Sequence, residues 1–142
     1  MRILLAVDGS PNSLDAVTTF VGHLDWFRRK PEVKLVYVHL PVPKIGGLTR
    51  VISKRALEAY YREEGEKALA KAVKLLDGAA VNYSTAMLVG QPAEMIVAEA
   101  EKERCDLIYM GTRGLGTVSN LVMGSVAGKV LHLSKIPVIL VR

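Results

Sequence analysis

The hydrophobic positions of this chain fall into five short runs, separated by longer stretches of mixed polarity. The runs are rich in Val, Ile and Leu, and only the third of them alternates clearly between apolar and polar residues. Continuous apolar runs of this length are typical of strands buried on both faces of a parallel sheet. The sequence therefore predicts strands at residues 2–7, 33–40, 80–88, 105–110 and 136–141.

The stretches between these runs have helical spacing. Ser10 is expected to cap the first helix and Pro11 to occupy its first position. Further helices are predicted at 53–77, from Gln91 onward and from Gly124 onward. Because strands and helices alternate without a linker or a repeat, we predict one α/β domain over residues 1–142. Its open five-stranded parallel sheet should carry helices on both faces.

The composition narrows the class of protein. Nineteen Lys and Arg residues against fourteen Asp and Glu residues leave a net charge of +5, but these charges are scattered, so no nucleic-acid partner is expected. Cys105 is the only cysteine, which excludes an internal disulfide. The apolar run from Ile3 to Val7 is too short for a secretory core, and no window approaches the length of a membrane span. We therefore expect a cytoplasmic protein without a membrane partner.

A glycine-rich junction follows the fourth predicted strand. Gly111 and Gly114 allow backbone N–H groups to point inward, and Gly124 and Ser125 open the next helix, whose N-terminus attracts anions. Ligands of open parallel sheets bind beyond the carboxyl ends of the strands, where Asp8-Gly9-Ser10 and His39-Leu40-Pro41 are also expected. The junction is thus either a cradle for phosphate groups or a tight passage from strand to helix.

Other sites are not indicated by the sequence. The stretch "GSVAGKV" has three residues where a Walker-A loop needs four between its glycines, and Val130 stands where that loop needs a hydroxyl group. "VDGSPNS" after the first strand lacks the glycine pattern of dinucleotide-binding proteins. The three histidines, His23, His39 and His132, do not have metal-ligand spacing, so no metal centre is expected.

The chain resembles the universal stress protein family over essentially its whole length. The resemblance rests on "VDGS", "GQPAEMIV", "CDLIYMGTRGLG", "MGSVAGKVL" and the closing "IPVILVR". Its most specific element is Gly, two residues, Gly, nine residues, Gly, then Ser or Thr, which Gly111, Gly114, Gly124 and Ser125 match without a gap. The resemblance implies an adenine nucleotide alpha-hydrolase-like sheet of order 3-2-1-4-5 and the ATP-binding type of the family.

The resemblance also implies a role for individual residues. Asp8 would bind the ribose hydroxyls, while Ala6, Val7 and the backbone of Leu40 would contact the adenine. The phosphates would be held by Gly111, Arg113, Gly114, Gly124, Ser125 and Val126. The expected ligand is ATP, with or without Mg²⁺, and AMP or another adenine nucleotide is the alternative.

Three functional hypotheses remain open from the sequence. The first is a nucleotide-binding regulator of the stress response. The second is a slow ATPase or phosphoryl-transfer enzyme, and the third is an interaction module that binds no nucleotide. The apolar last strand invites pairing with a second chain, and the resemblance implies a homodimer through residues 136–142. The loop 41–50, with Lys44 and Arg50, is either a ligand-binding segment or a plain connector.

Overall fold

The structure, a computed structural model, describes residues 1–43, 53–115 and 123–142. In chain order its elements are β1 (Arg2–Ala6), α1 (Pro11–Gly22), the short 3-10 helix η1 (Leu24–Trp26), β2 (Glu32–His39), α2 (Lys54–Gly78), β3 (Tyr83–Val89), α3 (Pro92–Lys102), β4 (Leu107–Gly111), α4 (Ser125–Leu133) and β5 (Val138–Val141). The five strands form one parallel sheet in the order β3-β2-β1-β4-β5. The predicted fold class and strand order are confirmed.

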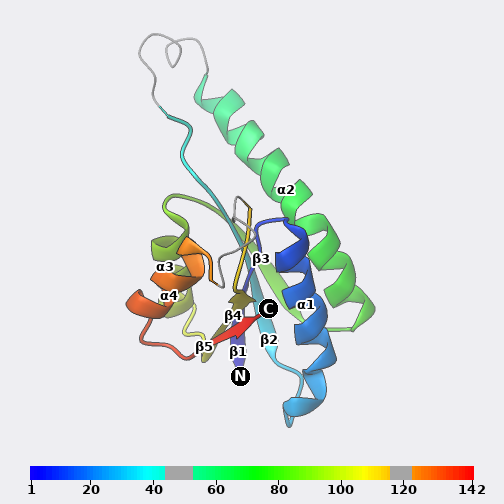
Figure 1. Cartoon of the computed structure of the whole chain (residues 1–142). Coiled ribbons are helices and arrows are strands. Elements are labelled where there is room, and N and C mark those ends of the chain that lie inside the picture. The colour runs from blue at the N-terminus through cyan, green and yellow to red at the C-terminus, as the bar shows by residue number, and fades with distance from the viewer. Residues whose placement is uncertain (44–52, 116–122) are drawn as a thin grey trace.

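Helices cover both faces of this sheet (Figure 1). Successive residues of β1 point to opposite faces, so Ile3 and Leu5 pack in the core beneath α1 and α2, whereas Leu4 packs in the core beneath α3 and α4. Phe20 of α1 and Ile96 of α3 belong to these two cores respectively. Burial on both faces explains why the strands read as continuous apolar runs.

The junction between β1 and α1 has the predicted N-cap. Ser10 Oγ accepts a hydrogen bond of 3.2 Å from the Ser13 N–H, and Pro11 occupies the first helical position. Gly9, just before the cap, has a φ of +79°, and a side chain there would press against Ala68 of α2. The first turn beyond β1 is therefore fixed against α2.

The third strand begins later than its hydrophobic pattern predicts. Ala80 has a φ of +50°, a left-handed conformation that interrupts the extended backbone, and β3 starts only at Tyr83. Val81 is nevertheless buried, so its apolar character reflects packing at the end of α2 and not strand pairing.

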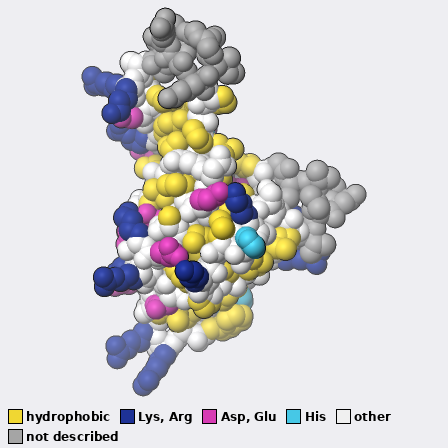
Figure 2. Space-filling view, turned by 90° about the vertical axis from the view of Figure 1, so that its left-hand side faces the viewer, with side chains coloured by type: hydrophobic (Ala, Val, Ile, Leu, Met, Phe, Trp, Pro, Cys, Tyr) yellow, Lys and Arg dark blue, Asp and Glu magenta, His cyan; other side chains and the backbone are white. Residues whose placement is uncertain are grey.

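The distribution of charged side chains on the surface agrees with the scattered charges of the sequence. Positive and negative side chains are interspersed on the face that carries α3 and α4 (Figure 2). No helix in the described ranges is both long enough and apolar enough to cross a membrane. The cytoplasmic location stays a prediction. The role of the loop 41–50 also stays open, because Lys44 and Arg50 lie outside the described residues.

Candidate functional site

A cavity of about 570 Å³ opens at the carboxyl ends of β1, β2 and β4. This is the size range of small-molecule sites, and it lies where the strand order reverses beside β1. All ten predicted site residues line it: Ala6, Val7, Asp8, Leu40, Gly111, Arg113, Gly114, Gly124, Ser125 and Val126. The structure thus brings these residues together, and their role in holding a nucleotide stays a prediction.

The inner wall of the cavity is apolar. It consists of side chains from the sheet and from the two helices on the α3 and α4 face, namely Ala6, Val36, Val38, Ile96, Met110 and Ala127. Most of this wall escaped the sequence analysis, because each residue also reads as an ordinary core position. An apolar wall beneath a polar rim suits a ligand with a flat hydrophobic part and a polar part.

Asp8 stands on the polar rim, just after β1. Its Oδ1 accepts a hydrogen bond of 3.0 Å from the Ser10 N–H, and its Oδ2 accepts one of 2.6 Å from the Leu115 N–H. Burial on its own would raise the pKa of this carboxyl group, but the hydrogen bonds from Ser10, Leu115 and Ser13 outweigh it and lower the pKa below its ordinary value. Asp8 is therefore a fixed anion and a hydrogen-bond acceptor at neutral pH.

Gly114 lies directly against the Asp8 carboxylate. A methyl group on the Gly114 Cα would overlap with Asp8 Oδ2, whereas the backbone at Gly114 does not have a positive φ. The glycine is needed here because of this close approach and not because of a special backbone conformation. The sequence analysis had attributed Gly114 to freedom of the backbone alone.

The end of β4 and the start of α4 meet, as the spacing of the glycines predicts. The Gly124 N–H donates a 2.7 Å hydrogen bond to the Thr112 carbonyl, and the Thr112 N–H donates one of 2.7 Å to the carbonyl of Val141. Ser125 is the first residue of α4, and its N-cap residue is Gly124. Gly124, Ser125 and Val126 all line the cavity, so the N-terminus of α4 and the positive end of its dipole lie at the cavity wall. Gly116 and the rest of 116–122 lie outside the described residues.

The β2 side of the cavity includes His39, which belongs to the segment expected to reach this edge after the second strand. The ring of His39 makes edge contacts with Tyr60 and Tyr61 of α2, with centroids 5.5 and 5.0 Å apart. Its Nδ1 is hydrogen-bonded to the carbonyl of Leu40, a residue that is 54% exposed. The backbone of Leu40 thus lies at the cavity edge, as predicted, and His39 fixes its carbonyl.

Two charged residues of the cavity wall were missed altogether. Lys129 of α4 forms an ion pair with Glu94 of α3, and both side chains line the cavity. The hydrogen bond from Lys129 lowers the pKa of the Glu94 carboxyl group. One signal in the sequence could have found Lys129, because it follows Ser125 by four residues and so shares its helix face.

No metal centre is evident in the part of the chain that the structure describes. No group of three or more His, Cys, Asp and Glu side chains is close enough there to hold an ion. Cys105 is buried just before β4, and desolvation raises the pKa of its thiol, which makes it a packing residue and not a nucleophile.

Comparisons of the sequence with a family model and with known proteins point to one family. The model of the universal stress protein family matches residues 1–142. A universal stress protein of Methanocaldococcus jannaschii is 36% identical over 141 residues, which cover 99% of this chain and 81% of that protein. A universal stress protein of Thermus aquaticus is 37% identical over 142 residues, which cover 99% of this chain and 97% of that protein.

Solved structures share the fold. The Methanocaldococcus jannaschii protein MJ0577 has a TM-score of 0.83 at 26% identity, over 99% of this chain and 94% of that chain. A universal stress protein in complex with cAMP and one from Archaeoglobus fulgidus in complex with dAMP each have a TM-score of 0.66, at 22 and 21% identity. They cover 100% of this chain and 96 and 98% of their own chains.

The predicted adenine nucleotide alpha-hydrolase-like fold is confirmed by these neighbours. The resemblance in sequence is confirmed by the match over the full range of residues and by relatives above one third identity. This chain belongs to the universal stress protein family.

Proposed function

We propose that this protein binds an adenine nucleotide, with ATP preferred, and acts as a regulator in the response to stress. One observation carries the proposal: Asp8 and the two ends of the glycine-rich junction converge on one cavity at the carboxyl edge of the sheet. Asp8 supplies a carboxylate for ribose hydroxyls, and the junction supplies backbone N–H groups and a helix N-terminus for phosphates. The apolar wall suits the purine ring.

The relatives support the adenine part of this proposal. Two neighbours of the same fold are complexes with cAMP and with dAMP. The preference for ATP rests on the unbroken spacing of Gly111, Gly114, Gly124 and Ser125, which offers donors to more than one phosphate group.

Binding is favoured over catalysis by the state of the lining carboxylates. Among the lining residues that the structure describes, the carboxylates belong to Asp8 and Glu94. Asp8 already accepts two backbone hydrogen bonds, and Glu94 is paired with Lys129. Neither is placed as a base for an attacking water, so hydrolysis should be slow or absent.

The test is calorimetric titration with ATP, AMP and cAMP, with and without Mg²⁺, after mass spectrometry of any nucleotide released on denaturation. Wild-type protein should bind ATP most tightly, and Asp8→Ala should lose at least tenfold in affinity, because a charged hydrogen-bond partner is removed. Asp15→Ala is the matched control, since Asp15 is exposed on α1 away from the cavity. Wild-type protein that binds no adenine nucleotide would overturn the proposal.

We further propose that the protein is a homodimer through β5. This strand is at the edge of the sheet, and all four of its residues are partly exposed. The carbonyls of Pro137 and Val141 face β4, so the N–H groups of Val138 and Leu140 face outward. In sedimentation at micromolar concentration, Leu140→Pro should shift the dimer to monomer, whereas Leu140→Ala keeps the N–H and should shift it less. A monomeric wild-type protein would contradict this assembly.

A further inference from the structure

The Glu94–Lys129 ion pair links two helices across the wall of the candidate site. Glu94 is the third residue of α3 and Lys129 the fifth residue of α4, and both line the cavity. The two side chains are 44% and 52% exposed, so solvent screens the pair and its contribution to stability is small. A weak pair inside a binding cavity can be exchanged for a ligand at little cost.

Lys129 is placed to reach the same region as Ser125. Residues four apart lie on one face of a helix, and long side chains lean toward the N-terminus of their helix. The ammonium group of Lys129 is therefore directed along the first turn of α4, where Ser125 and its N–H groups face the cavity. Among the lining residues within the described ranges, only Arg113 and Lys129 carry a fixed positive charge.

Glu94 occupies the ammonium group of Lys129 on the wall of the cavity. Lys129 donates a hydrogen bond to Glu94 Oε1. A carboxylate and a phosphate compete for the same ammonium donors, and the phosphate carries more charge and more acceptor oxygens. The carboxylate also repels any phosphate that does not displace it from Lys129.

We propose that Glu94 and Lys129 together set how many phosphate groups the ligand must carry. Lys129 binds the phosphate chain of the nucleotide beyond its first phosphate, and Glu94 holds Lys129 until that chain displaces it. A nucleoside triphosphate gains the Lys129 contact, whereas a monophosphate is too short to displace Glu94. The inference rests on the proposed function, since it takes a phosphate-bearing ligand in this cavity.

The test compares affinities for ATP and AMP in Lys129→Met and Glu94→Gln proteins by calorimetry at fixed salt concentration. Lys129→Met should weaken ATP binding about tenfold, the scale of one charge-assisted hydrogen bond, and change AMP binding less than about threefold. Glu94→Gln should tighten ATP binding by about threefold or more, because Lys129 is released. The ratio of ATP to AMP affinity is the readout, and a merely structural link between α3 and α4 would not move it.

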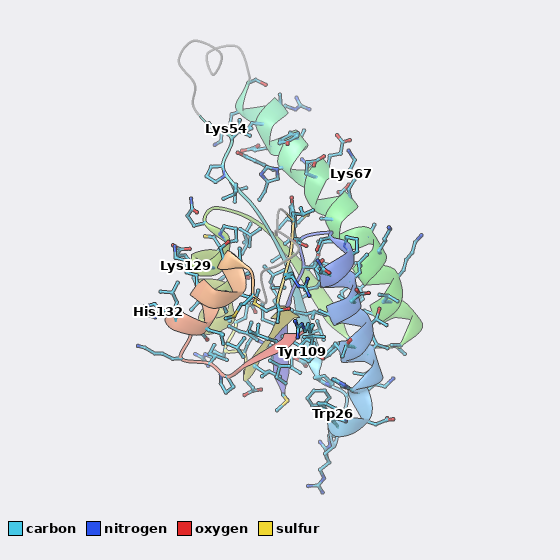
Figure 3. The ribbon with its side chains drawn as sticks, viewed as in Figure 1. Trp26, Lys54, Lys67, Tyr109, Lys129 and His132 are labelled. Carbon is cyan, nitrogen blue, oxygen red and sulfur yellow. The ribbon has the colours of Figure 1, made fainter. Side chains whose placement is uncertain are left out.

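A second ion pair on α2 provides a matched control. Glu63 and Lys67 are also exposed and paired, with Nζ and Oε1 2.9 Å apart. Lys67 lies on the outer side of α2, across the sheet from Lys129 (Figure 3). Lys67→Met and Glu63→Gln make the same changes in net charge and should leave both affinities at wild-type values. Affinities in the α4 and α3 variants that match these controls would overturn the inference.

Inorganic triphosphate separates this inference from the proposed function. If the wild-type protein binds triphosphate but no adenine nucleotide, and the two variants change that binding in opposite directions, the inference stands and the adenine assignment fails. If ATP binds and neither variant alters the ratio of affinities, the inference fails and the proposed function stands. If the wild-type protein binds neither ligand, both fail.

Discussion

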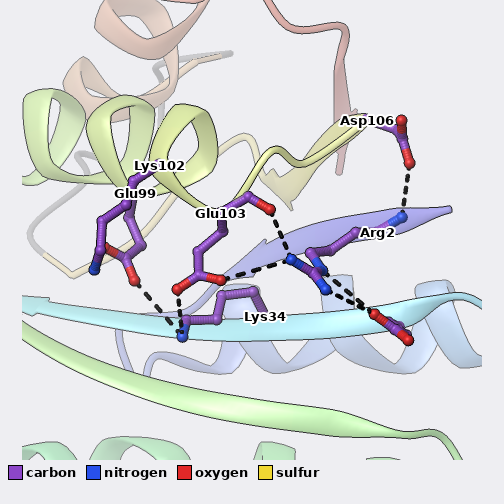
Figure 4. Close-up of polar contacts among 7 residues, drawn as sticks. Arg2, Lys34, Glu99, Lys102, Glu103 and Asp106 are labelled. Atoms are coloured by element: carbon purple, nitrogen blue, oxygen red, sulfur yellow. Dashed lines mark hydrogen bonds and ion pairs between the residues drawn. The ribbon is translucent and has the colours of Figure 1, made fainter.

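The two edges of the sheet use their charged residues differently. At the amino edge, Arg2 of β1 and Lys34 of β2 form ion pairs with Glu32, Glu99 and Glu103, and the Arg2 N–H donates a 2.7 Å hydrogen bond to Asp106 (Figure 4). At the carboxyl edge, the polar groups of Asp8, Gly114 and Ser125 line an open cavity. At the amino edge the charged side chains pair with one another, whereas at the carboxyl edge they line the larger cavity.

We expect the charged residues of the amino edge to contribute to stability and those of the carboxyl edge to ligand binding. Lys34 and Glu99 are 14% and 6% exposed and belong to the packing of α3 against β2, so their loss should unfold the protein more easily without affecting a ligand. Substitutions around the cavity should weaken ligand binding and leave the free energy of unfolding almost unchanged. The following experiments test whether the two edges are independent in this way.

The largest effect on stability is expected from Lys34→Met. The change removes the cation between Glu99 and Glu103 and leaves the buried Glu99 with Lys102, at 3.0 Å, as its remaining partner. Breaking a buried ion pair costs about 3 kcal/mol where the remaining charge is left unpaired, and the contact with Lys102 lessens this cost, so the free energy of unfolding in urea should fall by about 2 kcal/mol. Nucleotide affinity should change less than about twofold.

A double variant controls this prediction. Lys34→Met with Glu99→Leu leaves no buried charge unpaired at this position and should regain most of the lost stability. A single variant as stable as the wild-type protein would show that the amino edge is not held by these charges.

The next largest effect should come from Gly114→Ala at the other edge. The added methyl group overlaps with Asp8 Oδ2 and must displace either the carboxylate or the junction. We expect nucleotide affinity, measured by calorimetry, to fall about 30-fold or more, which corresponds to about 2 kcal/mol. Gly128→Ala, on α4, is the matched control because nothing lies within 4 Å of its added methyl group. Equal affinities in the two variants would contradict the close approach.

A smaller effect is expected from Arg2→Met at the amino edge. The Arg2–Glu32 pair is exposed, with Nη2 and Oε2 3.0 Å apart, and the backbone hydrogen bond to Asp106 survives the substitution. Solvent replaces most of what an exposed ion pair contributes. The midpoint of urea unfolding should therefore move much less than in Lys34→Met, and a loss as large would contradict the ranking by burial.

The smallest effect is expected from a change in pH between 8 and 5. The pKa of Asp8 is lowered from 3.8, and its folded-state pKa therefore lies below the unfolded value. Its contribution to stability is fully present above pH 3.8 and is lost as the pH falls through the lowered pKa. Glu103, whose pKa is lowered mainly by its hydrogen bond with Lys34, follows the same rule at the amino edge. Thermal unfolding monitored by circular dichroism should show no Asp8-dependent loss until the pH is below about 4.

The fold could be predicted because its strands are buried on both faces. The five apolar runs gave every strand within a few residues, and the exception, β3, begins late because Ala80 interrupts the extended backbone. The ten candidate site residues could be gathered because parallel strands end at one edge. Their assignment to particular parts of the nucleotide came from the family resemblance.

Contacts between distant elements could not be predicted. The Glu94–Lys129 pair depends on how α3 and α4 are rotated against each other, which hydrophobic spacing does not determine. Gly114 and Asp8 lie in loops that follow two different strands. The sequence shows the glycine but not that the Asp8 carboxylate lies against its Cα. The segment His39-Leu40-Pro41 could be placed at this edge because it follows the second strand, but the sequence does not show that the His39 ring packs on Tyr60 and Tyr61 of α2.

The contact between Asp8 and Gly114 also constrains how this chain can diverge. A side chain at position 114 would displace the carboxylate at position 8 from its present place, so we expect the two positions to change together among related proteins. Chains that carry a side chain at position 114 should therefore lack the acid at position 8 more often than chains that keep the glycine. The residues at positions 8 and 114 could then be used to group members of the family from their sequences alone.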